Sequence, residues 1–294
     1  MTLDGGLWVA LATPFRSDGA LDLLAFAKLI AHVRAGFTDA LVVLGSTGEA
    51  TAIEALERDT LIKVALENAS GTPVVVGCTA SATAEACRFA VRAQALGAHG
   101  ALIATPPYVK PSQAGILAHF AAIAKAAPGL PLIAYNIPSR CGVGMTLATV
   151  QELWRMPAVH GLKESSGDLA HIAAIAAITQ RDKLLLAGDD VLALPSIALG
   201  ACGLVSVAGN IVPQAMRQLV HAALEGELHT ARAQHEQLVP LLHELFTEPN
   251  PVPLKAALAL CDIGTDMVRL PLLTAQLTTR DRIAALLHKL GALA

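Results

Sequence analysis

The chain is poor in charge, in aromatic side chains and in cysteine motifs. Charged residues make up 15% of its 294 residues, and the formal net charge is −3. Such a charge provides neither a basic stripe for a nucleic acid nor a polybasic anchor for a membrane. The five cysteines include no CxxC pair, so their spacing indicates neither a zinc site nor a disulfide framework. We therefore expect reduced thiols and a cytoplasmic protein.

Signals for membrane insertion are also weak. The N-terminus lacks the basic start and apolar run of a signal peptide. One long uncharged stretch, Val191–Met216, has the length of a membrane span. However, Pro195, Gly203, Gly209 and Pro213 interrupt this stretch. The pattern favours a buried helix, a buried strand and their loops over a span.

Apolar residues are abundant, at 54% of the chain, which is enough to bury a large core. Short apolar runs that predict strands occur at Leu7–Ala12, Ala40–Leu44, Pro73–Gly77, Ala101–Ala104, Leu132–Tyr135, Val159–Lys163, Leu184–Ala187 and Gly203–Val207. Helical patterns follow them at Leu21–Ala35, Glu54–Ala69, Ala82–Leu96, Ser112–Ala126, Thr146–Trp154, Leu169–Ile178, Val191–Leu199 and Pro213–Glu225. Runs that are apolar throughout are typical of parallel strands buried on both faces. Eight strand–helix units favour an α/β fold of the (β/α)₈ (TIM) barrel type.

The chain continues beyond the eighth unit. Residues 227–294 are predicted to form further helices, interrupted at Pro249, Asn250 and Pro251. We therefore predict a catalytic barrel in residues 1–226 and a helical C-terminal extension in residues 227–294.

Active sites of such barrels form where strands end, so the polar residues at those points are candidates. Lys163 ends the sixth apolar run. Burial in the barrel mouth disfavours the ammonium form and frees the amine to attack a carbonyl. Only two tyrosines are present, Tyr108 and Tyr135, and both fall at or just past predicted strand ends. A phenol there can relay protons to a bound carbonyl, or it can simply pack.

Two further segments suggest carboxylate binding. The turn Gly45–Glu49 follows the second strand, and its N–H groups with the hydroxyls of Ser46 and Thr47 would suit a small carboxylate. Arg140, in the loop after the fifth strand, could clamp a carboxylate with two hydrogen bonds. Taken alone, the first segment favours an ordinary capped turn, and the second is equally an ordinary surface arginine.

Together these segments resemble the dihydrodipicolinate synthase and N-acetylneuraminate lyase family over nearly the whole chain. Each motif is weak alone, but the set in this order is specific. The matching landmarks are Gly45–Glu49, Thr105–Tyr108, Tyr135–Arg140, Gly161–Glu164, Gly188–Asp190 and Glu248–Pro251.

The resemblance implies a Schiff-base mechanism. Lys163 would form an imine with pyruvate, whose carboxylate Thr47 and nearby N–H groups would hold. Tyr135 would relay protons, and Ser46 would link it to Tyr108, which would reach into the site of a neighbouring subunit. Serine stands at position 46 where the synthases most often have threonine, and sialic acid lyases often have serine there.

The resemblance also implies the second substrate and the assembly. Arg140 would bind the carboxylate of L-aspartate-4-semialdehyde, and the product would be 4-hydroxy-tetrahydrodipicolinate of the lysine and diaminopimelate pathway. Backbone carbonyls near Gly188 and Val205 would line the pocket. No metal and no organic cofactor is implied, and the expected assembly is a homo-oligomer, as a dimer of dimers. Cys141, beside Arg140, introduces an oxidisable thiol.

Two alternatives stay open at the level of sequence. One is another pyruvate lyase of the same family, acting on a 2-keto-3-deoxy sugar acid, 4-hydroxy-2-oxoglutarate or sialic acid. The other is a non-catalytic binding protein on the same barrel.

Feedback inhibition by lysine is expected to be weak or absent. Lysine-sensitive relatives generally have histidines at positions 55 and 58, asparagine at 81 and tyrosine at 107. The residues at the matching positions of this chain are Ala50, Thr51, Ala55, Arg58, Ser81, Glu85 and Pro107.

Overall fold

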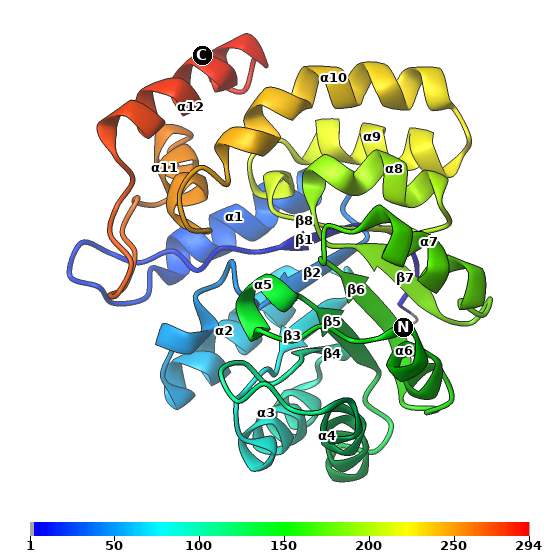
Figure 1. Ribbon diagram of the computed structural model, residues 1–294. Coiled ribbons are helices and arrows are strands. Elements are labelled where there is room, and N and C mark those ends of the chain that lie inside the picture. Colours follow the sequence, from blue (N-terminus) through cyan, green and yellow to red (C-terminus); the bar gives the residue numbers. More distant parts are fainter. Residues whose placement is uncertain (1–2, 294) are drawn as a thin grey trace.

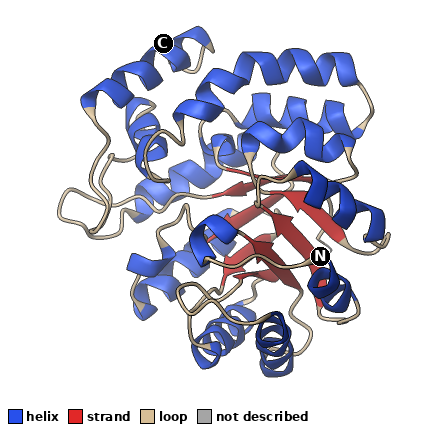
Figure 2. Ribbon diagram, in the orientation of Figure 1, coloured by secondary structure: helices blue, strands red, loops and turns tan. Residues whose placement is uncertain are grey.

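The computed structural model describes residues 3–293 and contains a closed barrel of eight parallel strands. Figure 2 shows the strands at the centre with helices around them. Each strand pairs with the next, and β8 pairs with β1 to close the barrel. The strands are β1 Gly6–Ala10, β2 Ala40–Val43, β3 Val74–Gly77, β4 Gly100–Ala104, β5 Leu132–Asn136, β6 Val159–Glu164, β7 Leu184–Ala187 and β8 Gly203–Ser206.

The predicted (β/α)₈ barrel is confirmed, and all eight strands lie where the apolar runs place them. The helices that follow the strands are α1 Leu23–Ala35, α2 Ala55–Asn68, α3 Thr83–Leu96, α4 Gln113–Ala126, α6 Leu147–Trp154, α7 Leu169–Ile178, α8 Ala193–Ala198 and α9 Pro213–Leu224. The periodicity did not indicate α5, Pro138–Cys141, a single turn directly after β5. Its four residues are too few to establish a helical repeat.

Strand residues alternate between two buried environments, which explains why the runs are apolar throughout. Leu7 and Val9 of β1 belong to the core between barrel and helices. Trp8 and Ala10 of the same strand belong to a second cluster inside the barrel. Because parallel strands in a barrel are covered on both faces, neither face favours polar residues except at the open end.

The C-terminal extension packs against the last barrel helices. It comprises α10 Leu228–Glu244, α11 Val252–Leu260 and α12 Leu277–Lys289, and the predicted break lies between α10 and α11. Figure 1 shows α10 alongside α8 and α9. Leu241 and Leu254 of the extension belong to the same hydrophobic core as the barrel helices. The division into two domains at residue 226 stays a prediction.

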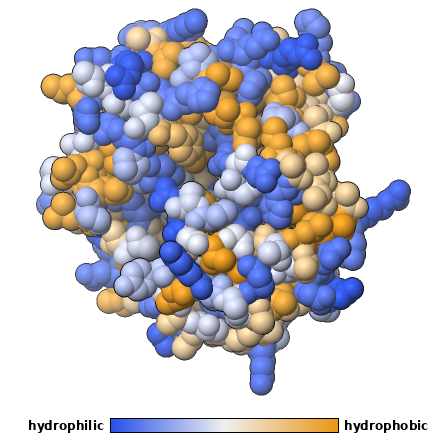
Figure 3. Space-filling model, in the orientation of Figure 1, coloured by the Kyte–Doolittle hydropathy of each residue, from blue (hydrophilic) through white to orange (hydrophobic). Residues whose placement is uncertain are grey.

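The long uncharged stretch forms α8, β8 and the start of α9, as the interrupted pattern predicts. Within residues 3–293, no helix combines the length and the apolar character needed to cross a membrane. On the face seen in Figure 3, hydrophilic and apolar side chains are interspersed.

Candidate active site

A small enclosed space, here called the inner cavity, lies at the carboxyl ends of the strands. Its volume is about 50 Å³. This is room for about three or four waters, and therefore for a ligand of only a few heavy atoms. Its lining is Ala10, Val42, Gly45, Ser46, Thr47, Leu102, Tyr135, Ile137, Arg140, Lys163, Gly188, Asp189, Val207, Phe246 and Asn250.

Lys163 and Tyr135 face each other in the inner cavity. They are register partners on the adjacent strands β6 and β5, so the barrel itself sets them side by side. The Nζ atom of Lys163 lies 4.3 Å from the centroid of the Tyr135 ring. The two side chains are 5% and 6% exposed, so the amine and the phenol share a pocket largely shielded from water. Such a setting suits attack of an amine on a bound carbonyl.

Gly188 leaves the space in which Lys163 lies. A Cβ atom at this position would lie 1.8 Å from the Ser165 hydroxyl oxygen and 2.9 Å from Cε of Lys163. A side chain here would therefore force the Ser165 hydroxyl to move and would crowd Lys163. Val205, the other residue expected to line the pocket, is fully buried deeper inside the barrel, and Val207 lines the cavity instead.

Ser46 and Thr47 lie in the turn after β2, and both line the inner cavity. The amide nitrogen of Asn250 donates to the Thr47 hydroxyl oxygen at 3.0 Å. Arg140, on α5, donates to the backbone oxygen of Asn250 at 3.3 Å. The extension therefore contacts both predicted carboxylate-binding residues.

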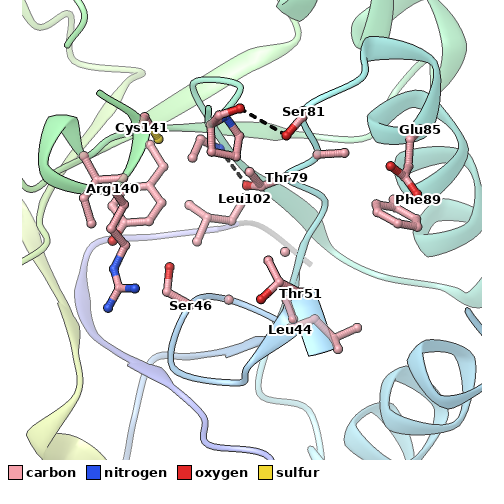
Figure 4. A pocket seen from close by; sticks show the side chains of 18 of the residues that line it. Leu44, Ser46, Thr51, Thr79, Ser81, Glu85, Phe89, Leu102, Arg140 and Cys141 are labelled. Carbon is pink, nitrogen blue, oxygen red and sulfur yellow. Dashed lines mark hydrogen bonds between the residues drawn. The ribbon is translucent and has the colours of Figure 1, made fainter. Parts of the chain in front are cut away.

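A larger outer cavity of about 450 Å³ adjoins the inner one. Gly45, Ser46, Tyr135 and Arg140 line both spaces. Figure 4 shows its far wall, where Glu85 and Phe89 of α3 and Ser81 face the side that holds Arg140 and Ser46. The Ser81 hydroxyl donates to the backbone oxygen of Pro107 at 3.0 Å.

Cys141 lines the outer cavity with only 3% of its surface exposed. Burial raises the pKa of its thiol to about 11, although the nearby Arg140 acts in the opposite direction. The thiol is therefore neutral near pH 7, which disfavours the oxidation considered from the sequence.

Tyr108 lies apart from the other predicted site residues. Its side chain is 90% exposed, and its backbone has a φ of 72°. It lines neither cavity of its own chain. A role in a neighbouring subunit therefore stays a prediction.

The structure adds residues that sequence reasoning did not select. Asp189 lines the inner cavity, where burial raises the pKa of its carboxyl group and the nearby Lys163 charge opposes the shift. The carboxylate of Asp190, whose pKa is also raised by burial, accepts the N–H of Val207 at 2.9 Å. Asn250 and Phe246 complete the lining from the extension. The motifs Gly188–Asp190 and Glu248–Pro251 were the available signals for Asp189 and Asn250.

Comparison with known families agrees with this geometry. The family model described as the dihydrodipicolinate synthetase family matches residues 4–290. The chain belongs to this family. The family resemblance drawn from the motifs is thereby confirmed.

Individual members of the dihydrodipicolinate synthetase family align over almost their full length. The 4-hydroxy-tetrahydrodipicolinate synthase of Methanosarcina mazei is 39% identical over 287 residues, covering 97% of this chain and 98% of the relative. A pyruvate complex of the chloride-inhibited enzyme from Acinetobacter baumannii superposes with a TM-score of 0.96 at 33% identity, over 99% of this chain and 100% of that one. The lysine-bound enzyme of Cyanidioschyzon merolae gives a TM-score of 0.96 at 36% identity, over 100% of both chains.

Proposed function

We propose that the protein is a 4-hydroxy-tetrahydrodipicolinate synthase, a Schiff-base lyase that condenses pyruvate with L-aspartate-4-semialdehyde. The observation that carries this proposal is the pairing of Lys163 with Tyr135 in a cavity sized for a small ligand. Membership of the dihydrodipicolinate synthetase family and the relatives' names support it.

The first half of the reaction joins pyruvate to the enzyme. The Lys163 amine attacks the C2 carbonyl carbon of pyruvate, and the carbinolamine loses water to give an iminium. Thr47 holds the pyruvate carboxylate together with N–H groups of its turn. Tyr135 passes protons to the departing hydroxyl and accepts one from C3, which leaves an enamine. Gly188 and Val207 shape the pocket.

The second half forms the carbon–carbon bond. Arg140 binds the carboxylate of L-aspartate-4-semialdehyde at the rim shared by both cavities. C3 of the enamine attacks the aldehyde carbon, whose oxygen takes up a proton through Tyr135. The amino group of the adduct then attacks the iminium carbon and expels the Lys163 amine. Ring closure releases 4-hydroxy-tetrahydrodipicolinate, and the iminium nitrogen serves as the only electron sink.

We further propose a cytoplasmic homo-oligomer, built as a dimer of dimers, in which Tyr108 completes the hydroxyl chain of a neighbouring site through Ser46. Tyr108 supports this assembly, because it is 90% exposed and has a positive φ. A strained backbone that presents a phenol to solvent is explained if a second subunit covers that phenol. The exposed leucines Leu270, Leu273 and Leu277, each more than 70% exposed, offer further apolar surface to a second copy.

Reductive trapping tests the proposed chemistry. Sodium borohydride with pyruvate should leave a reduced pyruvyl adduct on Lys163, located by mass spectrometry. Lys163→Ala should abolish the adduct and the activity. Lys183→Ala is the matched control, since Lys183 is also largely buried but donates to the Val159 carbonyl at the other end of β6. An adduct on another lysine, or none, would refute the proposal.

A panel of aldehydes then tests the second substrate. L-Aspartate-4-semialdehyde should give the highest kcat/KM when it is compared with sugar-acid aldehydes at saturating pyruvate. A sugar-acid aldehyde that reacts faster would instead identify one of the related lyases.

Subunit mixing tests the role of Tyr108. Inactive Tyr108→Phe and Lys163→Ala subunits should regenerate activity when they are refolded together, because one site of each mixed dimer is then intact. A fully active monomer in sedimentation would contradict the shared site.

A further inference from the structure

The turn Gly45–Glu49 has a backbone that its own sequence does not favour. Leu44, directly before it, and Glu49, at its end, have φ values of 57° and 51°. A side chain strains the backbone in this left-handed region, so the surroundings must hold the conformation. Thr13 supplies one support from the barrel, since its hydroxyl donates to the backbone oxygen of Gly48 at 2.8 Å.

The C-terminal extension supplies the other supports. Lys255 of α11 is 1% exposed, and its ammonium forms an ion pair with the Glu49 carboxylate. The same ammonium donates to the backbone oxygen of Met267 at 2.8 Å and lies 3.9 Å from the ring centroid of Phe15. The second Glu49 carboxylate oxygen accepts the backbone N–H of Arg269 at 2.9 Å. Both oxygens of the Glu49 carboxylate are thus held by residues of the extension.

The extension reaches the turn at a second point, through Asn250. Its amide donates to the Thr47 hydroxyl oxygen, which leaves the hydroxyl hydrogen free to donate into the inner cavity. Thr47 is therefore held from one side by Asn250, and two residues later the turn is held by Lys255.

Stability alone does not account for a buried ion pair at this place. The free energy needed to remove two charges from water offsets much of their electrostatic attraction. Replacing such pairs by apolar residues is therefore often neutral or stabilising. The desolvation here is strong, because burial lowers the pKa of Lys255 to about 8 despite the opposing effect of Glu49. A retained buried pair can instead specify a geometry, and this pair contacts the residue that ends the turn.

We propose that Glu49 and Lys255 are positioning residues for the ketoacid substrate: their buried ion pair fixes the turn so that Thr47 and its N–H groups meet the substrate carboxylate. The extension is then part of the substrate site, although Lys255 touches no substrate. This inference rests on the proposed function, in which Thr47 holds the carboxylate of pyruvate.

The test compares Glu49→Gln, Lys255→Met and the double variant with the wild-type enzyme. Glu49→Gln keeps the size and the acceptor for Arg269, so it is the mildest change. Glu57→Gln is the control, because Glu57 pairs with the Arg269 side chain at the same junction but touches neither the turn nor Lys255. Each variant is assayed for melting temperature, for both KM values and kcat, and for the pyruvate concentration that half-saturates borohydride trapping.

We expect each single variant to raise the pyruvate KM and the trapping midpoint about tenfold, with kcat and the aldehyde KM changed less than about threefold. The double variant should be no worse than the worse single variant, because both residues act through one pair. Glu57→Gln should lower the melting temperature and leave the trapping midpoint unchanged. Should Lys255→Met not fold, Glu49→Gln and the double variant carry the same comparison.

The inference fails if the variants melt earlier but are trapped at the wild-type midpoint, since the pair would then be structural only. It also fails if Glu57→Gln shifts the midpoint as much as Glu49→Gln does. These outcomes differ from failure of the proposed function, which is the absence of a Lys163 adduct in the wild-type enzyme.

Discussion

The inner and outer cavities share one wall but are built differently. The inner cavity includes residues of five strands, β1, β2, β4, β5 and β6, and barrel register sets Lys163 beside Tyr135. The far wall of the outer cavity is formed by loops and α3, where Ser81 and Glu85 lie. Strand ends in a closed barrel cannot shift singly, whereas loop residues can change without disturbing the scaffold. We therefore predict that small substitutions in the inner cavity abolish activity. The outer cavity, in contrast, should tolerate substitutions and should not bind lysine tightly.

The largest effect is expected from Gly188→Ala. The added methyl group would meet the Ser165 hydroxyl at 1.8 Å and Cε of Lys163 at 2.9 Å. Misplacing the proposed nucleophile, Lys163, should lower kcat/KM roughly a thousandfold or more. Borohydride trapping of pyruvate on Lys163 measures this step directly.

Gly97→Ala serves as the control for loss of a glycine. A Cβ atom at Gly97 would meet nothing within 4 Å, and this residue caps α3 without lining either cavity. Its φ of 96° means that the substitution should cost stability while trapping stays normal. Normal trapping in the Gly188 variant would show that the inner cavity is not rigid.

A smaller and selective loss is expected from Arg140→Ala. Removing a bidentate carboxylate partner should lower kcat/KM for L-aspartate-4-semialdehyde about tenfold to a thousandfold while sparing imine formation with pyruvate. Steady-state kinetics and trapping together separate the two steps. Arg155→Ala is the matched control, since Arg155 is exposed and pairs with Glu152 on the surface. An unchanged kcat/KM would favour the related lyases.

Lysine should inhibit weakly or not at all. The outer cavity presents Ser81, Glu85 and Pro107, without the asparagine and tyrosine of sensitive relatives. Arg58 does not replace them, because its guanidinium is buried, donates to the Gly77 carbonyl at 2.5 Å and lies 3.9 Å from the centroid of the Phe89 ring. Each lost hydrogen bond to a charged ligand group costs about 1.5–3 kcal/mol of binding free energy. The measurement is activity at saturating substrates with lysine raised into the millimolar range. Clear inhibition at sub-millimolar lysine would show that the site has been rebuilt.

The smallest effect is expected at Cys141. With its thiol buried and its pKa raised to about 11, iodoacetamide at neutral pH should leave it unlabelled in the folded protein. Mass spectrometry before and after unfolding checks this, because unfolding should expose all five cysteines. Rapid labelling of Cys141 in the native enzyme would indicate that the outer cavity opens.

The sequence by itself determined the architecture and selected the proposed nucleophile. Eight apolar runs, each followed by a helical pattern, identify a barrel because parallel strands must be covered on both faces. Lys163 and Tyr135 could be selected because polar residues at the carboxyl ends of such runs lie at the open end of the barrel, where active sites form. The motifs, in their order along the chain, identified the family.

Only the tertiary structure decided how the proposed carboxylate site is held. Asn250 meets Thr47 across 203 residues of sequence, and Lys255 meets Glu49 over a similar distance. No local pattern encodes such contacts, since they depend on barrel closure and on how the extension folds back. The position of Arg140 likewise depends on the single turn of α5, which is too short to give a periodic signal in the sequence. The local sequence determines the helices and strands, whereas the pairing of side chains that are remote in sequence depends on the packing of the whole chain.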